Sequence, residues 1–277
     1  MDSVRFYKMS GSGNDFIFVD NRDGSFPYDD PADAARLLCR RGVSVGADGL
    51  VLIKSADDPS LDFRWRFYNA DGSEADMCGN AARCAARLAH TLGISGVNAS
   101  FLTGAGVIRA EVLESGRVKL AMTDPKDTEL GRTLTISKGR YAYHYSDTGV
   151  PHAVLVTDDV TTMDVGSLGS AVRYHEDFAP SGVNANFVRV EDDGTVTIRT
   201  YERGVEAETL ACGTGAVAAA VTLALAGEVS PPVNLVPTSG IPLAVHFTKN
   251  ENNVTDVYLE GDARLIYTAT LHNDALM

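Results

Sequence analysis

The feature that most constrains the fold of this chain is an internal repeat. In residues 66–82 a strand-like segment leads through a polar loop to a Cys-Gly pair and an apolar, helix-like segment, and residues 199–216 repeat that order. Cys78 and Cys212 occupy corresponding places, roughly 134 residues apart. Repetition of a strand, a loop, a Cys-Gly pair and a helix in one order predicts a duplicated domain.

Local patterns predict mostly strands and few helices. Apolar and polar residues alternate, as in a strand with one buried face, in residues 61–67, 118–122 and 196–201. Helices are predicted over residues 81–90 and 216–226, which Gly93 and Gly227 would end, and more weakly over residues 32–41. The helix at 216–226 has no charged residue and is therefore expected to be buried on all sides.

These patterns predict an α+β fold of two duplicated domains, each a mostly antiparallel sheet or barrel wrapped around one buried central helix. The first domain is predicted to span residues 1–122 and the second residues 123–262, with a linker at Asp124-Pro125-Lys126-Asp127. Because each domain carries one copy of the Cys-Gly motif, the active site is expected in the interdomain cleft.

Composition narrows the class of partner. The 277 residues include 24 Lys and Arg against 37 Asp and Glu, a net charge of −13, so binding to nucleic acid is not expected. The apolar part of residues 210–227 is too short to span a bilayer, and the first residues lack the apolar core of a secretory signal. We therefore expect a cytoplasmic protein without a membrane partner, in which the 4 cysteines stay reduced.

The repeat places two cysteines where thiol chemistry is favoured. Cys78 and Cys212 each precede a predicted helix, where free N–H groups and the positive end of the helix dipole stabilise a thiolate. Their pKa values are therefore expected below the usual value of about 8.5. The first amides of the two helices form sites for a carboxylate and come from Gly79, Asn80, Gly213 and Thr214.

Two thiols facing one small anion suit proton transfer at a stereocentre. One thiolate would remove the proton from an α-carbon while the opposed thiol supplies another to the opposite face, which inverts the configuration without cofactor or metal. Stabilisation of the enolate-like charge by helix-end amides requires a site that excludes water, so the domains are expected to close over the substrate.

Other motifs favour simpler interpretations. Cys39 and Cys84 lie within predicted helices and are expected to pack in the core. No Cys-x-x-Cys or His-x-x-x-His spacing favours a zinc site. The glycine pairs at residues 11–13 and 104–106 lack the third glycine of a dinucleotide loop and fit turns better.

The motifs resemble those of the diaminopimelate epimerase family, which belongs to the cofactor-independent amino-acid racemases. The similar segments lie across most of the chain in the family's order: residues 11–16, 68–74, 77–83, 149–152, 201–204 and 211–216. Proline and hydroxyproline racemases share the two-cysteine plan, but their first motif usually continues Cys-Gly-His where this chain has Cys78-Gly79-Asn80.

The resemblance implies an isomerase that interconverts LL- and meso-2,6-diaminoheptanedioate in lysine and peptidoglycan precursor synthesis, without a cofactor. It implies that Cys78 and Cys212 are the acid and base and that His152 and Glu202 tune their pKa values. The implied substrate-binding residues are Asn14, Asn69, Gly79, Asn80, Asn184, Glu202, Arg203, Gly213 and Thr214. An Arg suits the distal carboxylate because it can pair with both oxygens. Without the resemblance, Glu202 and Arg203 would be interpreted as a surface ion pair and His152 as a loop histidine.

The family also implies a homodimer with Tyr267 at its interface and a C-terminal segment, residues 263–277, that returns to the first domain. The chain departs from the family at Val150, where an Asn is common, and at Gly49, where some members have a Gln. The alternatives are a racemase of another amino acid, such as proline or hydroxyproline, a non-catalytic amino-acid-binding protein of the same fold, and a disulfide-linked structural protein.

Overall fold

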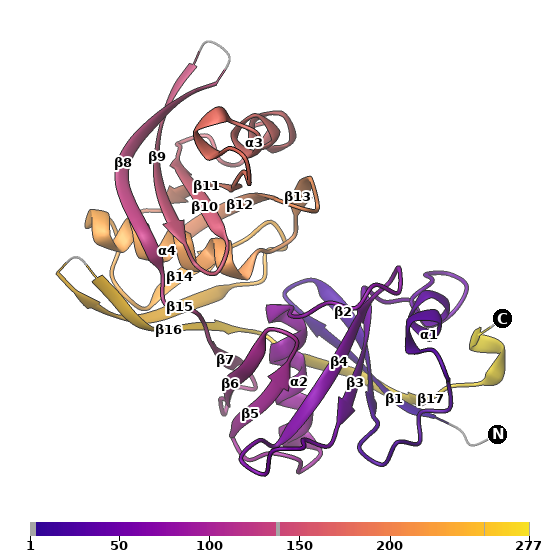
Figure 1. Ribbon diagram of the computed structural model, residues 1–277. Helices are drawn as coiled ribbons and strands as arrows, with labels where there is room; N and C mark the ends of the chain where they lie inside the picture. Colours follow the sequence, from indigo (N-terminus) through magenta and orange to yellow (C-terminus); the bar gives the residue numbers. More distant parts are fainter. Residues whose placement is uncertain (1–3, 137–138, 252, 277) are drawn as a thin grey trace. The chain divides into compact units, whose positions relative to one another are not determined.

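The computed structural model describes residues 4–136, 139–251 and 253–276, which form two compact units (Figure 1). One unit holds the chain up to Leu120 and from Gly261 onward, and the other runs from Ala121 to Glu260. These boundaries lie within two residues of those predicted from the sequence, 122/123 and 262/263. In the described ranges no helix is both long and apolar enough to cross a membrane.

The first unit is a mixed sheet around helix α2. Its strands are paired in the order β17-β1-β2-β3-β4-β5-β6-β7, with β2–β3 and β4–β5 parallel and the other pairs antiparallel. The strands are β1 (Arg5–Gly11), β2 (Asn14–Asp20), β3 (Gly49–Lys54), β4 (Phe63–Asn69), β5 (Asn98–Thr103), β6 (Gly106–Val112), β7 (Val118–Ala121) and β17 (Arg264–Thr270). The helices are α1 (Pro31–Leu38), α2 (Gly79–Thr91) and the 3₁₀ helix η2 (Asn273–Leu276).

The second unit repeats this plan around helix α4. Its strands are paired in the order β8-β9-β10-β11-β12-β14-β15-β16, with β10–β11 and β12–β14 parallel, and β13 adds to β12. The strands are β8 (Lys126–Ile136), β9 (Gly139–Asp147), β10 (Pro151–Val156), β11 (Asn184–Val190), β12 (Val196–Glu202), β13 (Ala207–Thr209), β14 (Val233–Val236), β15 (Leu243–Asn250) and β16 (Asn253–Gly261). The helices are α3 (Val165–Arg173), the 3₁₀ helix η1 (Glu176–Phe178) and α4 (Gly213–Ala226).

The predicted α+β fold with two duplicated, mostly antiparallel halves is confirmed. The parallel pairs and the two main helices of each unit occur at the same places in the strand order. Even an ion pair recurs: Arg66 meets Glu74 through two hydrogen bonds of 2.8 and 2.7 Å, and Arg199 meets Glu208 at the same two distances. The repeat is therefore visible in topology and in side chains.

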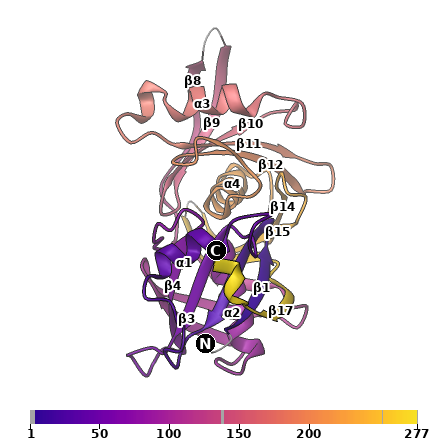
Figure 2. The ribbon, with the colours of Figure 1, turned by 90° about the vertical axis from the view of Figure 1, so that its right-hand side faces the viewer.

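Helix α4 is buried because it is apolar on every side. Residues 215–224 of the helix are all buried, and they pack against side chains of the surrounding strands, including Val154, Leu235 and Val245. Figure 2 shows α4 nearly end-on, with the strands of its unit around it. Gly227, with φ 85°, ends the helix in the left-handed conformation that glycine favours, as predicted.

The other helices differ in detail from the prediction. Helix α2 extends the predicted 81–90 at both ends, and α1 ends at Leu38, three residues before the predicted limit. Helix α3 was not predicted, because its glycines lower helix propensity. At Gly169 a Cβ would lie 2.4 Å from Cβ of Tyr201, so a glycine lets α3 pack closely on β12.

Candidate active site

Cys78 lies at the beginning of the buried helix of the first unit. It is the N-cap of α2 with an extended backbone (φ −145°, ψ 119°), and its side chain makes no capping hydrogen bond. The first N–H groups of a helix have no partner within the helix. A Cβ on Gly79 would first meet Leu120 Cδ2, at 4.0 Å, so the glycine leaves room for a ligand beside the first amide. Cys78 is half-buried and forms no disulfide.

Cys212 has the corresponding position in the second unit. It is the N-cap of α4, and its sulfur accepts a hydrogen bond from the N–H of Gly215 at 3.4 Å. The hydroxyl of Thr214 lies 3.5 Å from the same sulfur. The hydroxyl of Thr148, in the turn between β9 and β10, donates to the carbonyl of Thr214 at 3.0 Å and so anchors the beginning of the helix. Both cysteines thus lie at helix N-termini, as the sequence predicted.

The prediction that the pKa of Cys212 lies below its usual value is wrong. Although part of the residue is exposed, burial of the thiol and the negative charge of Glu202 raise the pKa of Cys212 to about 12. The Thr214 hydroxyl and the Gly215 amide act in the opposite direction. The helix-end amides do stabilise the thiolate, but desolvation and a neighbouring carboxylate outweigh them. Cys212 is therefore a thiol at neutral pH.

Glu202 is the direct partner of Cys212. The residue ends β12, its carboxylate accepts a hydrogen bond from the Thr209 hydroxyl at 2.5 Å, and it is also hydrogen-bonded to the Cys212 thiol. Burial raises the pKa of the Glu202 carboxyl above its usual range. A carboxylate in contact with a thiol can accept or return its proton. Glu202, which the resemblance implied to tune the cysteines, lies beside Cys212.

His152 lies on β10 and is fully buried. Its Nδ1 lies 3.1 Å from Nδ2 of Asn186, which also donates to the carbonyl of Ala153 at 3.0 Å. The Asn186 carbonyl accepts from the Thr200 hydroxyl at 3.0 Å, and a Cβ on Gly215 would lie 2.3 Å from the same oxygen. Burial and the charge of Arg203 lower the pKa of His152 to about 3, so the ring is neutral. His152 therefore supports the beginning of α4 through Asn186.

Asn184 and Arg203 are held next to each other in the second unit. The Asn184 side chain accepts from the Arg203 main-chain N–H at 2.9 Å and donates to the Pro151 carbonyl at 3.0 Å. The Arg203 side chain lines a cavity of about 580 Å³ together with Tyr145, Asp147 and Pro151 of the same unit. A guanidinium on such a cavity can pair with a carboxylate.

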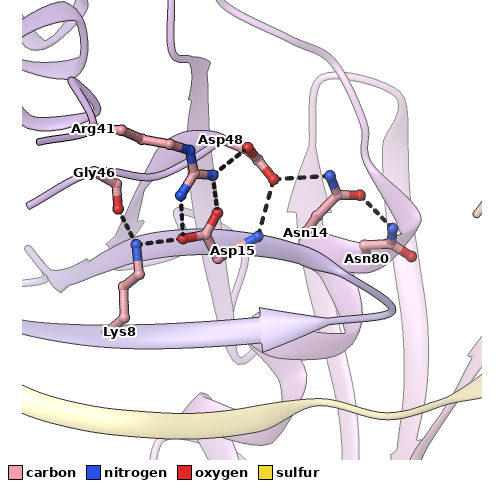
Figure 3. A network of polar contacts seen from close by, with 7 residues as sticks. All are labelled: Lys8, Asn14, Asp15, Arg41, Gly46, Asp48 and Asn80. Carbon is pink, nitrogen blue, oxygen red and sulfur yellow. Dashed lines mark hydrogen bonds and ion pairs between the residues drawn. The ribbon is translucent and has the colours of Figure 1, made fainter. Parts of the chain in front are cut away.

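The first unit holds a chain of polar side chains at the beginning of α2 (Figure 3). Asn80 Nδ2 donates to Asn14 Oδ1 at 2.7 Å, and Asn14 Nδ2 donates to Asp48 Oδ2 at 2.9 Å. The buried Arg83 guanidinium donates to Asn80 Oδ1 at 2.7 Å. The structure thus brings together two of the predicted substrate-binding residues, Asn14 and Asn80. Asn69 ends β4 and is bonded to the Ser73 hydroxyl at 3.0 Å.

Several residues around the two cysteines were not predicted. Asp48 and Arg83 hold the Asn14–Asn80 pair, while Asn186 and Thr209 contact His152 and Glu202. The one available signal was Arg83, a charged residue in the middle of an Ala-rich helix. Asp48, Asn186 and Thr209 stand in segments whose residue types are ordinary for loops and strands.

The two departures from the family's pattern have different surroundings. Gly49 is buried on β3, and a Cβ there would lie 2.5 Å from the Phe67 ring and 2.7 Å from the Tyr68 carbonyl. The Phe67 ring therefore occupies the space that a longer side chain at residue 49 would need. Val150 is half-buried in the turn before β10, and its carbonyl accepts from the Thr148 N–H at 3.2 Å.

The remaining cysteines are buried in the core. Burial raises the pKa of Cys39 to about 12 and raises the pKa of Cys84 still further, so both thiols are unreactive. Within the described ranges, no group of three or more His, Cys, Asp and Glu side chains is arranged to hold a metal ion.

Comparisons with known proteins agree with this architecture. Residues 6–127 and 144–266 match the family model described as "Diaminopimelate epimerase". The chain is 44% identical over 281 residues to "Diaminopimelate epimerase" of Aquifex aeolicus (strain VF5), a match that covers 99% of each chain.

Solved structures share the fold at low sequence identity. A PhzF-family phenazine biosynthesis protein of Bacillus anthracis superposes with a TM-score of 0.72 at 13% identity, covering 98% of this chain and 100% of that chain. A hydroxyproline epimerase of Agrobacterium vitis, with bound trans-4-hydroxy-L-proline, gives 0.64 at 17% identity, covering 98% and 93%. The family match over both halves and the full-length relative decide the assignment: the chain belongs to the diaminopimelate epimerase family.

Proposed function

We propose that the protein interconverts LL- and meso-2,6-diaminoheptanedioate by moving a proton at one α-carbon. The observation that carries the proposal is the duplication of the cysteine site: Cys78 and Cys212 each begin the buried helix of their unit. A single cysteine could exchange the α-proton on one face, but inversion needs an acid and a base on opposite faces. Membership of the family supports the choice of substrate.

In the proposed reaction one sulfur is a thiolate and the other a thiol. The thiolate takes the α-proton, the electron pair moves into the carboxylate to form an enolate-like intermediate, and the thiol delivers its proton to the opposite face. If each sulfur comes within about 3 to 3.5 Å of the carbon, the two sulfurs lie about 6 to 7 Å apart in the complex. The proposal therefore requires the two units to close on the substrate.

The helix-end amides would hold the reacting carboxylate. Gly79 and Asn80 begin α2, and Gly213 and Thr214 begin α4, so their N–H groups can stabilise the extra negative charge of the intermediate. An α-proton is far less acidic than a thiol, so this stabilisation must provide much of the rate acceleration. Asn14, Asn69 and Asn184 are proposed to bind the other polar groups of the substrate.

Glu202 and Arg203 are each proposed to bind a substrate group whose charge is opposite to their own. The Arg203 guanidinium suits the distal carboxylate, and the Glu202 carboxylate suits an ammonium group. An ammonium group beside Glu202 would offset the charge that raises the pKa of Cys212. Substrate binding would then favour ionisation of this thiol, which allows the reaction to run in both directions. His152 is proposed to act on the same thiol indirectly, through Asn186 and the first turn of α4.

The test is proton exchange in heavy water. Reduced protein without added pyridoxal phosphate is incubated with LL-diaminopimelate in D₂O, and we expect one deuterium at the inverted α-carbon with formation of the meso isomer. Parallel incubations with proline and trans-4-hydroxyproline decide between this substrate and the alternative racemases. Absence of deuterium from diaminopimelate with active-site thiols titrated as free would refute the proposal. Binding without exchange would instead favour an amino-acid-binding protein.

We also propose that the protein is a homodimer that uses strand β17. This strand pairs with β1, yet its apolar side chains are exposed, including Leu265, Ile266 and Tyr267. Neighbouring exposed apolar residues on a strand favour a protein interface. We expect Tyr267→Ala to lower the dimer fraction in sedimentation velocity, and an unchanged fraction would exclude this interface.

A cytoplasmic location is consistent with a mechanism that needs two reduced thiols.

A further inference from the structure

Of the side chains in Figure 3, Asp48, Asn14 and Asn80 form one hydrogen-bonded series. Beyond the figure the series continues to the guanidinium of Arg83. Asp48 accepts from Asn14, Asn14 accepts from Asn80, and Asn80 accepts from Arg83, at 2.9, 2.7 and 2.7 Å. We call these four residues the amide relay. The relay lies at the beginning of α2, beside the first amides that follow Cys78.

The charges at the two ends fix the orientation of both amide groups. A carboxylate can only accept, so Asn14 must turn its NH₂ group toward Asp48 and its oxygen toward Asn80. A guanidinium can only donate, so Asn80 must turn its oxygen toward Arg83 and its NH₂ group toward Asn14. Reversal of either amide would place two donors or two acceptors against each other.

Each end of the relay is itself held in place. Asp48 also accepts from the Arg41 side chain at 2.7 Å and from the Asp15 main-chain N–H at 3.1 Å. Arg83 is fully buried and also donates to the Ser12 hydroxyl at 2.7 Å and to the Asp262 carbonyl at 3.3 Å. Neither charge can turn away without breaking several other hydrogen bonds.

We propose that Asp48 and Arg83 are positioning residues that set which atoms Asn14 and Asn80 present to the substrate. An amide oxygen has two lone pairs and an NH₂ group has two donors, so each group in the relay keeps one beyond those used. Asn14 Oδ1 is left to accept from an ammonium group, and Asn80 Nδ2 is left to donate to a carboxylate. The inference rests on the proposed function, in which these two asparagines bind the amino-acid substrate.

The variant Asp48→Asn tests the relay with little change in shape. An Asn at residue 48 must offer its one oxygen to Arg41 or to Asn14, and its NH₂ group then opposes the other donor. Without a carboxylate that can only accept, Asn14 is no longer held in one orientation, and part of the molecules are expected to present its NH₂ group where the substrate ammonium binds. Loss of a hydrogen bond to a charged group predicts a rise in KM of about 10- to 100-fold. Because the contact is equally present in ground and transition states, we expect kcat to change by less than about 3-fold.

Asp15→Asn is the matched control. Asp15 shares Arg41 with Asp48 and pairs with Lys8 at 2.7 Å, but its side chain does not belong to the relay. A general effect of lost charge in this cluster would raise KM in both variants. The relay predicts a large rise for Asp48→Asn and a KM within about 2-fold of the parent for Asp15→Asn.

A second measurement separates this inference from the proposed function. The side-chain NH₂ signals of Asn14 and Asn80 in ¹⁵N-labelled protein, assigned by their loss in Asn14→Ala and Asn80→Ala, are expected to shift in Asp48→Asn and to stay in place in Asp15→Asn. Unmoved signals in Asp48→Asn, or an unchanged KM, would overturn the relay. If the parent protein exchanged no α-proton of diaminopimelate, the proposed function would fail, while the NH₂ signals would still decide whether Asp48 orients the amides.

Discussion

The two units share a fold and differ in the groups that surround their cysteines. At the beginning of α2 lie the buried cation Arg83 and the amide relay, whereas α4 carries no charged residue and has Val217 at the position that corresponds to Arg83. At the end of the strand that precedes the helix, the charged residue is in the second unit instead. β4 ends with the neutral Asn69, whereas β12 ends with Glu202, which contacts Cys212.

This difference shows what duplication preserves. The backbone makes each cysteine the N-cap of the buried helix of its own unit, so the local placement of the two thiols is the same. The neighbouring charges are not symmetric, because a cation favours a thiolate and a carboxylate favours a thiol. The charge of Arg83 is coupled electrostatically to Cys78, and the charge of Glu202 to Cys212. The cysteine sites thus differ in the charge coupled to them, a guanidinium for Cys78 and a carboxylate for Cys212.

Replacing Cys78 or Cys212 should have the largest effect on the rate of epimerisation. If the two thiols have complementary roles, Cys78→Ala and Cys212→Ala should each slow epimerisation by about 10²- to 10⁴-fold, the usual contribution of a general acid or base. Cys84→Ala is the control, because this thiol is buried on the same helix as Cys78 and has no proposed role. Near-normal inversion by either of the first two variants would contradict the two-base mechanism.

His152 tests a second difference between the units, since the corresponding position in the first unit holds Phe16, a buried ring that cannot titrate. The pKa of His152 is lowered from 6.5 to about 3 in the folded protein. Below pH 6.5 the unfolded chain therefore binds a proton that the folded chain does not, and stability falls with decreasing pH. The slope is about 1.4 kcal/mol per pH unit until His152 itself is protonated near pH 3.

His152→Gln should remove this part of the slope, because the glutamine oxygen can still accept from Asn186 and does not titrate. The measurement is urea unfolding of both proteins between pH 4 and pH 8, taken as the difference in free energy of unfolding so that other groups cancel. The parent should lose stability relative to His152→Gln as the pH falls below about 6. Parallel curves would show that His152 is not buried as a neutral ring.

Glu202→Gln should bring the second cysteine closer to an ordinary thiol. Removing the negative charge lowers the pKa of Cys212, so alkylation of Cys212 by iodoacetamide at pH 8 should speed up by about tenfold for each pKa unit. Glu208→Gln is the control, because Glu208 pairs with Arg199 and has no bond to the thiol. Peptide mass analysis distinguishes Cys212 from Cys78, which belongs to the other unit. Equal alkylation rates in the parent and Glu202→Gln would exclude the carboxylate as the cause.

The sequence predicted what the backbone determines and missed what side-chain contacts determine. The uncharged helix α4 and the Cys-Gly motifs follow from local patterns, and the structure has them in the expected order. Helix α3 escaped prediction because Gly169 is selected by contact with Tyr201, which no local pattern reveals. The pKa of Cys212 was predicted in the wrong direction for the same reason: helix amides are visible in the sequence, while burial and the approach of Glu202 are not.

The smallest expected effect concerns the ion pair that recurs in both units. Arg66–Glu74 and Arg199–Glu208 have the same geometry, but the side chains are 44% and 49% exposed in the first pair and 22% and 23% in the second. Water and salt screen the more exposed pair, so a double-mutant cycle with alanine should give a coupling of about 0.2 to 1 kcal/mol for Arg66–Glu74.

Arg199–Glu208 should give a larger coupling, about 1 to 3 kcal/mol, because a less hydrated charged hydrogen bond is stronger. Arg199 also donates to the carbonyls of Val160 and Met163, at 3.1 and 3.0 Å, so Arg199→Ala alone should destabilise the protein more than Arg66→Ala. The cycle subtracts that extra cost and isolates the pair. In 1 M NaCl the coupling in the first unit should fall more than in the second, since salt reaches exposed charges first. Equal couplings and equal salt responses would mean that the shared geometry of the two pairs determines their strength. The difference in side-chain exposure between the units would then have no effect.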